Sequence, residues 1–309
     1  WDLDLDPENP MEMPDEAVPI FGSHVWDKMT PKEKAELRRH TQAWNISQFL
    51  QGEQAALLAA SKIVQSVPDL DSKFYAATQV MDEARHVEAY KKLLGKFGVA
   101  YPMTDPLQVL VNQALSDSRW DVTYLAMQVV IEGLALAAFG TIRDIAQNPL
   151  ARQVNAYVME DESRHVAFGR VSLRDYYPQL TQAERDEREE FLVEACYLMR
   201  DRMTRGTIVY DTLGLPAEEC DAFSQTSEIV QLYRTMLFQR IVPIVKDIGL
   251  WGPKIRKCYE DMGVLHFADL DPEALQDEDV RVAQEIDAGK ARRDYIEAVA
   301  AHGAAGHAE

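Results

Sequence analysis

Apolar residues recur along this chain with a period close to 3.6, and alternating strand-like runs are nearly absent. This pattern predicts an all-α protein. Thr30 and Pro31 followed by Glu33 form a helix start, and Gly98 is typical of a helix end. Such signals predict long helices at residues 30–67, 69–97, 117–147, 150–177, 181–212 and 217–248, the last of them interrupted at Pro243, and short ones at 107–115 and 251–262.

Long helices joined mostly by short turns predict a helical bundle with further helices packed on it. Residues 1–29 are acidic and contain prolines, so we expect an extended N-terminal arm over the surface. Residues 30–180 would form the four-helix bundle, and residues 181–265 the additional helices. Residues 266–309 are acidic and then rich in alanine and glycine, and we expect a peripheral, frayed tail.

An internal repeat runs through the predicted bundle. Residues 82–87 read Asp-Glu-Ala-Arg-His-Val, and residues 161–166, 79 positions further on, read Asp-Glu-Ser-Arg-His-Val. A lone glutamate in an apolar helix lies 30 residues before the glutamate of each copy, Glu53 in the first half and Glu132 in the second. Each half therefore supplies one glutamate from one helix and a Glu-x-x-His pair from the next.

The chemistry of these residue types explains the spacing. Positions i and i+3 share a helix face, so each Glu-x-x-His pair can present two ligands inward. Four carboxylates and two imidazoles form a hard, mixed oxygen and nitrogen set suited to iron or manganese. A single Glu-x-x-His is usually a solvated face, and a buried glutamate can instead bond a tyrosine or arginine. Two copies at one offset favour a two-metal site, with the ligands Glu53, Glu83, His86, Glu132, Glu162 and His165.

Composition and charge limit the partners. Hydrophobic residues make up 47% of the chain, enough for a large core, and the net charge of −19 argues against nucleic acid or a membrane surface. The most apolar stretch, residues 129–140, contains Glu132 and is too short for a membrane span. The three cysteines form no disulfide framework. These features predict a cytoplasmic protein.

The repeat resembles the ferritin-like di-iron carboxylate superfamily. That superfamily includes ribonucleotide reductase small subunits, multicomponent monooxygenase hydroxylases, p-aminobenzoate-type N-oxygenases, desaturases and rubrerythrins. The resemblance covers about residues 30–180 and implies a ferritin-like bundle. It also implies that Asp82 and Asp161 accept hydrogen bonds from the ligand imidazoles, with Arg85 and Arg164 balancing their charge.

Two positions differ from narrower families. Monooxygenase hydroxylases carry a threonine one turn after the third glutamate, where this chain has Leu136. N-oxygenases add a third histidine four residues before the last glutamate, where this chain has Val158. Side chains one turn from the ligands are expected to line a substrate pocket, although packing is their default role: Phe49, Leu57, Gln128, Leu136 and Val158.

The resemblance implies an enzyme in which two iron ions, or manganese and iron, activate O₂ to hydroxylate, N-oxygenate or desaturate a small apolar or aromatic substrate. Electrons would come from a separate reductase or ferredoxin, and a homodimer is expected. A second possibility is a radical generator resembling the reductase small subunits. Its support is Tyr90, four residues after His86, although an aromatic residue there can simply pack the bundle. Iron storage is a third possibility.

Overall fold

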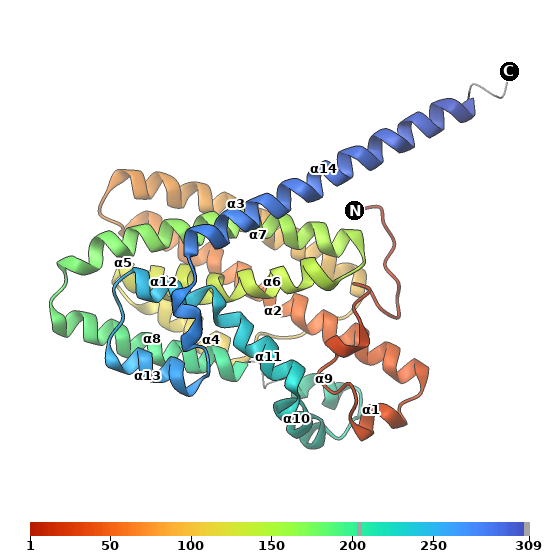
Figure 1. Cartoon of the computed structure of the whole chain (residues 1–309), viewed down its shortest axis with the longest axis horizontal. Coiled ribbons are helices and arrows are strands. Elements are labelled where there is room, and N and C mark those ends of the chain that lie inside the picture. The colour runs from red at the N-terminus through yellow and green to blue at the C-terminus, as the bar shows by residue number, and fades with distance from the viewer. Residues whose placement is uncertain (203–205, 306–309) are drawn as a thin grey trace.

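Helices account for all of the regular secondary structure in the computed structural model, which describes residues 1–202 and 206–305. Within these residues there is no strand, so the prediction of an all-α fold is confirmed. Figure 1 shows a central group of long helices with shorter helices against its lower side and one long helix projecting beyond it.

The core is a four-helix bundle in which α2 pairs with α3, and α6 pairs with α7 (Figure 1). The sequence signals set the helix ends: Thr30 Oγ1 accepts from the Glu33 N–H in a capping box, and Gly98 ends a helix at a φ of 69°. The long elements of the bundle are α2 (Pro31–Ser66), α3 (Leu70–Phe97), α6 (Glu132–Ile145) and α7 (Pro149–Tyr176).

The third long stretch, Trp120–Ile145, is not a uniform α-helix. It begins as α5 (Trp120–Tyr124), continues as a π-helical segment, Leu125–Ile131, and becomes α6 at Glu132. The sequence prediction of a plain helix missed this segment, whose seven residues are all buried. A π-helical turn changes the direction of the side chains that follow it, and such turns are frequent at functional sites.

The stretch Trp120–Ile145 is also long and apolar enough to cross a membrane by composition alone. In the fold, 83% of its most apolar window is buried inside the protein. Its apolar character is therefore accounted for by its place in the bundle core.

The helices added after the bundle are shorter than predicted. The expected helix at 181–212 is α8 (Gln182–Arg202) and α9 (Thr207–Thr212), with residues 203–205 outside the described part of the chain. The expected helix at 217–248 is wrong, because Ser227 is extended (ψ 124°) and separates two helices. Serine competes with helix through local hydrogen bonds, which makes such a break easy. The remaining elements are α4 (Asp105–Ser116), α10 (Ala217–Thr226), α11 (Glu228–Met236), α12 (Ile241–Asp247) and α13 (Pro253–Asp261).

Both end segments contact the bundle more closely than expected. Residues 1–29 contain the short helix α1 (His24–Lys28) and bury Met11 and Ile20 completely. The described tail is the helix α14 (Pro272–Ala305), whose first half packs on α7 and whose far half projects from the body (Figure 1). Asp279 is buried there and accepts a 2.7 Å hydrogen bond from Arg240. The expectation of a frayed tail is thus wrong for this half; residues 306–309 lie outside the described part.

Gly169 on α7 allows the π-helical segment to approach. A Cβ atom at Gly169 would lie 2.6 Å from Cβ of Gln128, too close for any real contact. We predict that Gly169→Ala lowers the free energy of unfolding by about 1–3 kcal/mol, because the segment must shift. The control is Gly95→Ala on the exposed face of α3, where nothing lies within 4 Å and stability should rise slightly. Equal effects of the two substitutions in urea unfolding would contradict this account.

Candidate metal centre

Six acidic and imidazole side chains meet in the middle of the bundle. They are at most 5% exposed, and each of the four long helices contributes at least one of them. Glu53 comes from α2, and Glu132 is the first residue of α6, directly after the π-helical segment. The two Glu-x-x-His pairs come from α3 and α7: Glu83 with His86, and Glu162 with His165. The structure thus brings together all six side chains that the repeat singles out.

These side chains form two overlapping groups. In each group, one candidate ligand atom per residue lies within 4.8 Å of the others. Glu83 and Glu162 belong to both groups, whereas Glu53 and His86 belong to one, and Glu132 and His165 to the other. This is the arrangement that two neighbouring cations need if two carboxylates are to bridge them.

The two imidazoles point the same ring nitrogen at the carboxylates. His86 Nδ1 lies 3.0 Å from Glu162 Oε1 and 3.3 Å from Glu53 Oε2. His165 Nδ1 lies 3.2 Å from Glu83 Oε1. Each histidine therefore offers Nδ1 to the centre and keeps Nε2 for another partner.

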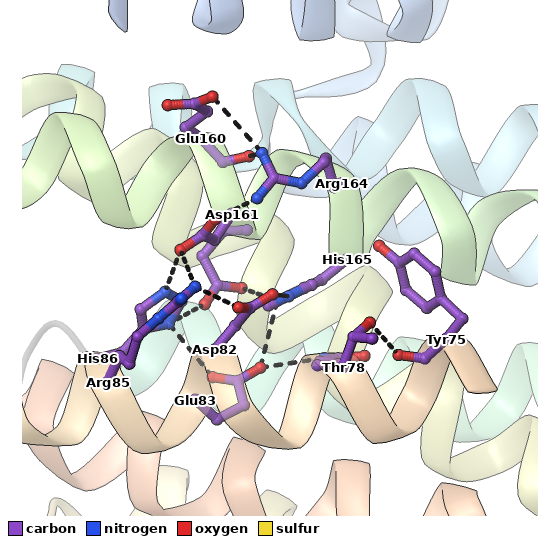
Figure 2. Close-up of polar contacts among 12 residues, drawn as sticks. Tyr75, Thr78, Asp82, Glu83, Arg85, His86, Glu160, Asp161, Arg164 and His165 are labelled. Atoms are coloured by element: carbon purple, nitrogen blue, oxygen red, sulfur yellow. Dashed lines mark hydrogen bonds and ion pairs between the residues drawn. The ribbon is translucent and has the colours of Figure 1, made fainter. Parts of the chain in front are cut away.

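The other ring nitrogen of each histidine faces an aspartate from the opposite half of the repeat. His86 Nε2 lies 3.1 Å from Asp161 Oδ2, and His165 Nε2 lies 3.3 Å from Asp82 Oδ2. Arg85 and Arg164 pair with these aspartates in turn (Figure 2). A carboxylate behind a ligand imidazole fixes the ring orientation and makes the ring a better metal ligand.

Burial and close contacts between charged groups shift the pKa values of the central side chains. Burial, together with the charge of Glu162, raises the pKa of Glu53 and Glu132 well above the usual range. Burial alone would lower the pKa values of the two histidines. The negative charge of Glu53 instead raises the pKa of His86, and the negative charge of Glu162 raises the pKa of His165. Burial also opposes ionisation of Glu83, yet the two imidazoles beside this carboxylate lower its pKa to about 2.

Several buried atoms of the centre make no hydrogen bond. Among the described residues these include Glu83 Oε2, Glu132 Oε2, His165 Nδ1 and both carboxylate oxygens of Glu162. Leaving such atoms unpaired in an apolar core is costly, and a cation would satisfy them directly. The donor set therefore fits a pair of hard or borderline divalent metal ions.

Two glutamines form a polar end of the centre, and sequence reasoning missed one of them. Gln79 Nε2 donates to Glu83 Oε1 at 3.0 Å and to Glu132 Oε1 at 3.1 Å. Gln128 Nε2 donates to Gln79 Oε1 at 3.3 Å. The available signal was the position of Gln79, one helical turn before Glu83 on the ligand face.

The opposite end of the centre is aromatic. Phe49 lies 5.7 Å from the ring of Tyr90 and 4.7 Å from Phe139, measured between ring centroids. Tyr90 is fully buried and its hydroxyl donates to Asn155 Oδ1 at 3.1 Å, not to a ligand carboxylate. This aromatic end lies one turn from Glu53 and His86.

The five residues expected to line a substrate pocket lie at both ends of the metal centre. Leu136 lines a cavity of about 460 Å³, and the other four do not line it. Phe49 and Val158 are buried in the core. Gln128 belongs to the polar end, and Leu57 is half-buried one turn beyond Glu53, away from Phe49.

Comparison with known proteins identifies the family and the fold. Residues 1–249 match the family model of the p-aminobenzoate N-oxygenase AurF. Among solved structures, a protein from Synechococcus with aldehyde deformylating oxidase activity is similar, with a TM-score of 0.55 and 18% identity. That match covers 72% of this chain and 96% of the other, and confirms the ferritin-like helical bundle. A search of curated protein sequences finds no match.

We predict that Asp161→Ala weakens metal binding by about 10- to 100-fold, because His86 loses the carboxylate that orients it. Asp175→Ala is the control, since Asp175 is an exposed aspartate on the same helix. Competition with a coloured chelator measures both variants. Equal affinities for the two would show that Asp161 does not support the site.

A second prediction concerns protons. Bound metal requires deprotonated carboxylates and neutral ring nitrogens, whereas the raised pKa values of Glu53, Glu132 and both histidines favour their protonated forms. Metal binding should therefore release protons, and the affinity should rise as the pH rises. Calorimetry in two buffers with different ionisation enthalpies measures the release, which should be smaller in Glu53→Gln. Binding heats that do not depend on the buffer would contradict this prediction.

Proposed function

Because the chain belongs to the p-aminobenzoate N-oxygenase family, it is a di-iron oxidoreductase, and we propose that it uses two iron ions and O₂ to oxidise a small organic substrate. The observation that carries this proposal is the pair of buried ligand groups that share Glu83 and Glu162. Fold likeness alone would not suffice, because ferritin-like bundles serve several functions.

Each ligand has a distinct part in the proposed centre. Glu83 and Glu162, which belong to both ligand groups, would help to hold both ions, whereas Glu53 and His86 would help to hold one of them and Glu132 and His165 the other. Four carboxylates carry four negative charges, which two divalent ions neutralise in a core that cannot tolerate unpaired charge. Manganese in one position is compatible with the same ligands.

The bound ions would supply the electrons that reduce O₂, and the protein would supply position and protons. Asp161 and Asp82 hold the two imidazole rings in fixed orientations. Gln79 donates to Glu83 and Glu132, and so restrains the positions of these two carboxylates. Continued turnover needs an external electron donor, for which we propose a reductase or a ferredoxin.

The family name makes N-oxygenation of an aromatic amine the first reaction to test, with hydroxylation and desaturation as the other possibilities. The expected homodimer, the cytoplasmic location and the lack of nucleic-acid or membrane partners stay predictions. Iron storage is disfavoured, because the family match extends well past the bundle into the added helices. A radical role of Tyr90 keeps one supporting fact, its complete burial beside the ligand Glu53.

Metal content and oxygen reactivity test the proposal together. We predict two ferrous ions bound per chain and a transient absorption change when the loaded protein meets O₂ under stopped flow. Glu162→Ala should lose both, because this carboxylate belongs to both ligand groups. Glu88→Ala on the exposed face of α3 is the control and should retain both.

Three outcomes of this experiment would separate the alternatives. Faster decay of the transient with an aromatic amine supports the oxygenase. A tyrosyl radical signal that is lost in Tyr90→Phe would favour the radical generator instead. Failure of the wild-type chain to bind iron would overturn the proposal as a whole.

A further inference from the structure

The cavity of about 460 Å³ lies at the aromatic end of the metal centre, between residues 13–19, α2, α6 and the helices α9–α11. On α6 it is lined by Leu136 and Gly140. These two residues follow Glu132 at intervals of four residues, and so lie near the helix face that carries Glu132. On α2 it is lined by Asn45, eight residues before Glu53. Along α2 the cavity therefore lies about two helical turns from Glu53, and along α6 it lies about one turn from Glu132.

The side chains between the cavity and the ligands are apolar. Phe49 lies between Asn45 and Glu53 along α2 and packs edge-on against Phe139 at 4.7 Å. Leu136 is 3% exposed and lies between Glu132 and Gly140 along α6. A molecule in the cavity could thus reach toward the metal ligands past Phe49 and Leu136 while its far end stayed in the cavity.

The charged groups on the wall are compensated or acidic. Arg143 pairs with Asp144 at 2.7 Å, and Arg240 pairs with Asp279 at 2.7 Å. These are the two cationic side chains among the described lining residues. The wall also carries the carboxylates of Glu16 and Asp221. Arg234, beside the wall, offsets the charge of Asp221. An anionic ligand would therefore find both wall cations already paired with carboxylates and would meet the further negative charge of Glu16.

Two neutral polar side chains on the wall have unused hydrogen-bonding capacity. Thr41 and Asn45 are one helical turn apart on α2, and both are half-buried. Among the described residues, neither the Thr41 hydroxyl nor the Asn45 amide has a hydrogen-bonding partner. A hydroxyl and an amide together can donate to and accept from an uncharged polar group such as an amide, alcohol or carbonyl.

We propose that this cavity binds the substrate as an elongated, uncharged and mainly apolar molecule, with one polar group at Thr41 and Asn45 and the other end toward Leu136. The lined part of α6, from Leu136 to Ile145, rises about 14 Å, which sets the length. The apolar body packs against Trp44, Val209 and Ile229. Calling the bound molecule the substrate depends on the proposed function; the binding site and its charge preference do not.

Binding of two matched probes tests the inference. Decanamide and decanoate share one apolar chain and differ in charge at pH 7.5, and calorimetry measures their binding to the full chain with and without ferrous iron, under anaerobic conditions. We expect decanamide to bind about tenfold more tightly than decanoate. Equal binding, tighter binding of decanoate, or binding of neither probe would overturn the inference.

Two variants test the position of the polar group. Asn45→Leu should weaken decanamide binding about three- to tenfold and leave decanoate binding unchanged. Asn45→Lys places a free cation in the cavity and should raise the affinity for decanoate about fivefold or more. Asn112→Lys, the same substitution at an exposed position of α4, is the control. Wild-type affinities in both Asn45 variants would overturn the placement of the ligand.

The proposed enzyme and the proposed binding site can be tested separately. A chain that binds decanamide with the expected preference but takes up no iron would keep the cavity inference and overturn the proposed enzyme. A chain that binds two iron ions and reacts with O₂ but prefers decanoate would keep the enzyme and overturn the inference.

Discussion

The constraint on which the rest of the structure depends is the burial of four carboxylates in one apolar core. Glu53, Glu83, Glu132 and Glu162 are at most 5% exposed, and their burial, together with their mutual repulsion, raises the pKa of Glu53 and Glu132 well above the usual range. Protons, imidazolium groups or metal ions must neutralise them. The crossed Asp–His contacts follow from this, because each aspartate stabilises positive charge at the centre from outside the ligand shell.

The sequence predicts the bundle and the six central residues because both leave periodic signals. Helix faces repeat every 3.6 residues, and a duplicated half-unit repeats its ligands at a fixed offset. It does not predict features set by contacts between helices. The π-helical segment depends on how Gln128 packs against Gly169 of α7, and the crossed pairing of Asp82 and Asp161 depends on which helices face each other. The first half of α14 likewise meets the rest of the protein through the contact of Asp279 with Arg240, two residues that carry no shared pattern.

The repeat is symmetric at the ligands and asymmetric one turn away from them. Shifting the first half by the same 79 residues places Phe49 on Gln128, Gln79 on Val158, and Tyr90 on Gly169. One end of the centre therefore carries an aromatic pair with Val158, and the other carries two hydrogen-bonded glutamines against a glycine. Ligands of two similar ions would need equal geometry, whereas the side chains around them are free to diverge.

This divergence decides which end of the centre can accept an organic molecule. At the polar end, Gln128 fills the space beside Gly169 so closely that no Cβ fits there, and Gln79 occupies the hydrogen-bonding oxygens of Glu83 and Glu132. At the aromatic end, Phe49 and Leu136 present apolar surface to the ligands, and the cavity begins behind them. An apolar molecule that packs against such surface breaks no hydrogen bonds, and the burial of its own apolar surface favours binding. The aromatic end is therefore the end at which we place the proposed substrate.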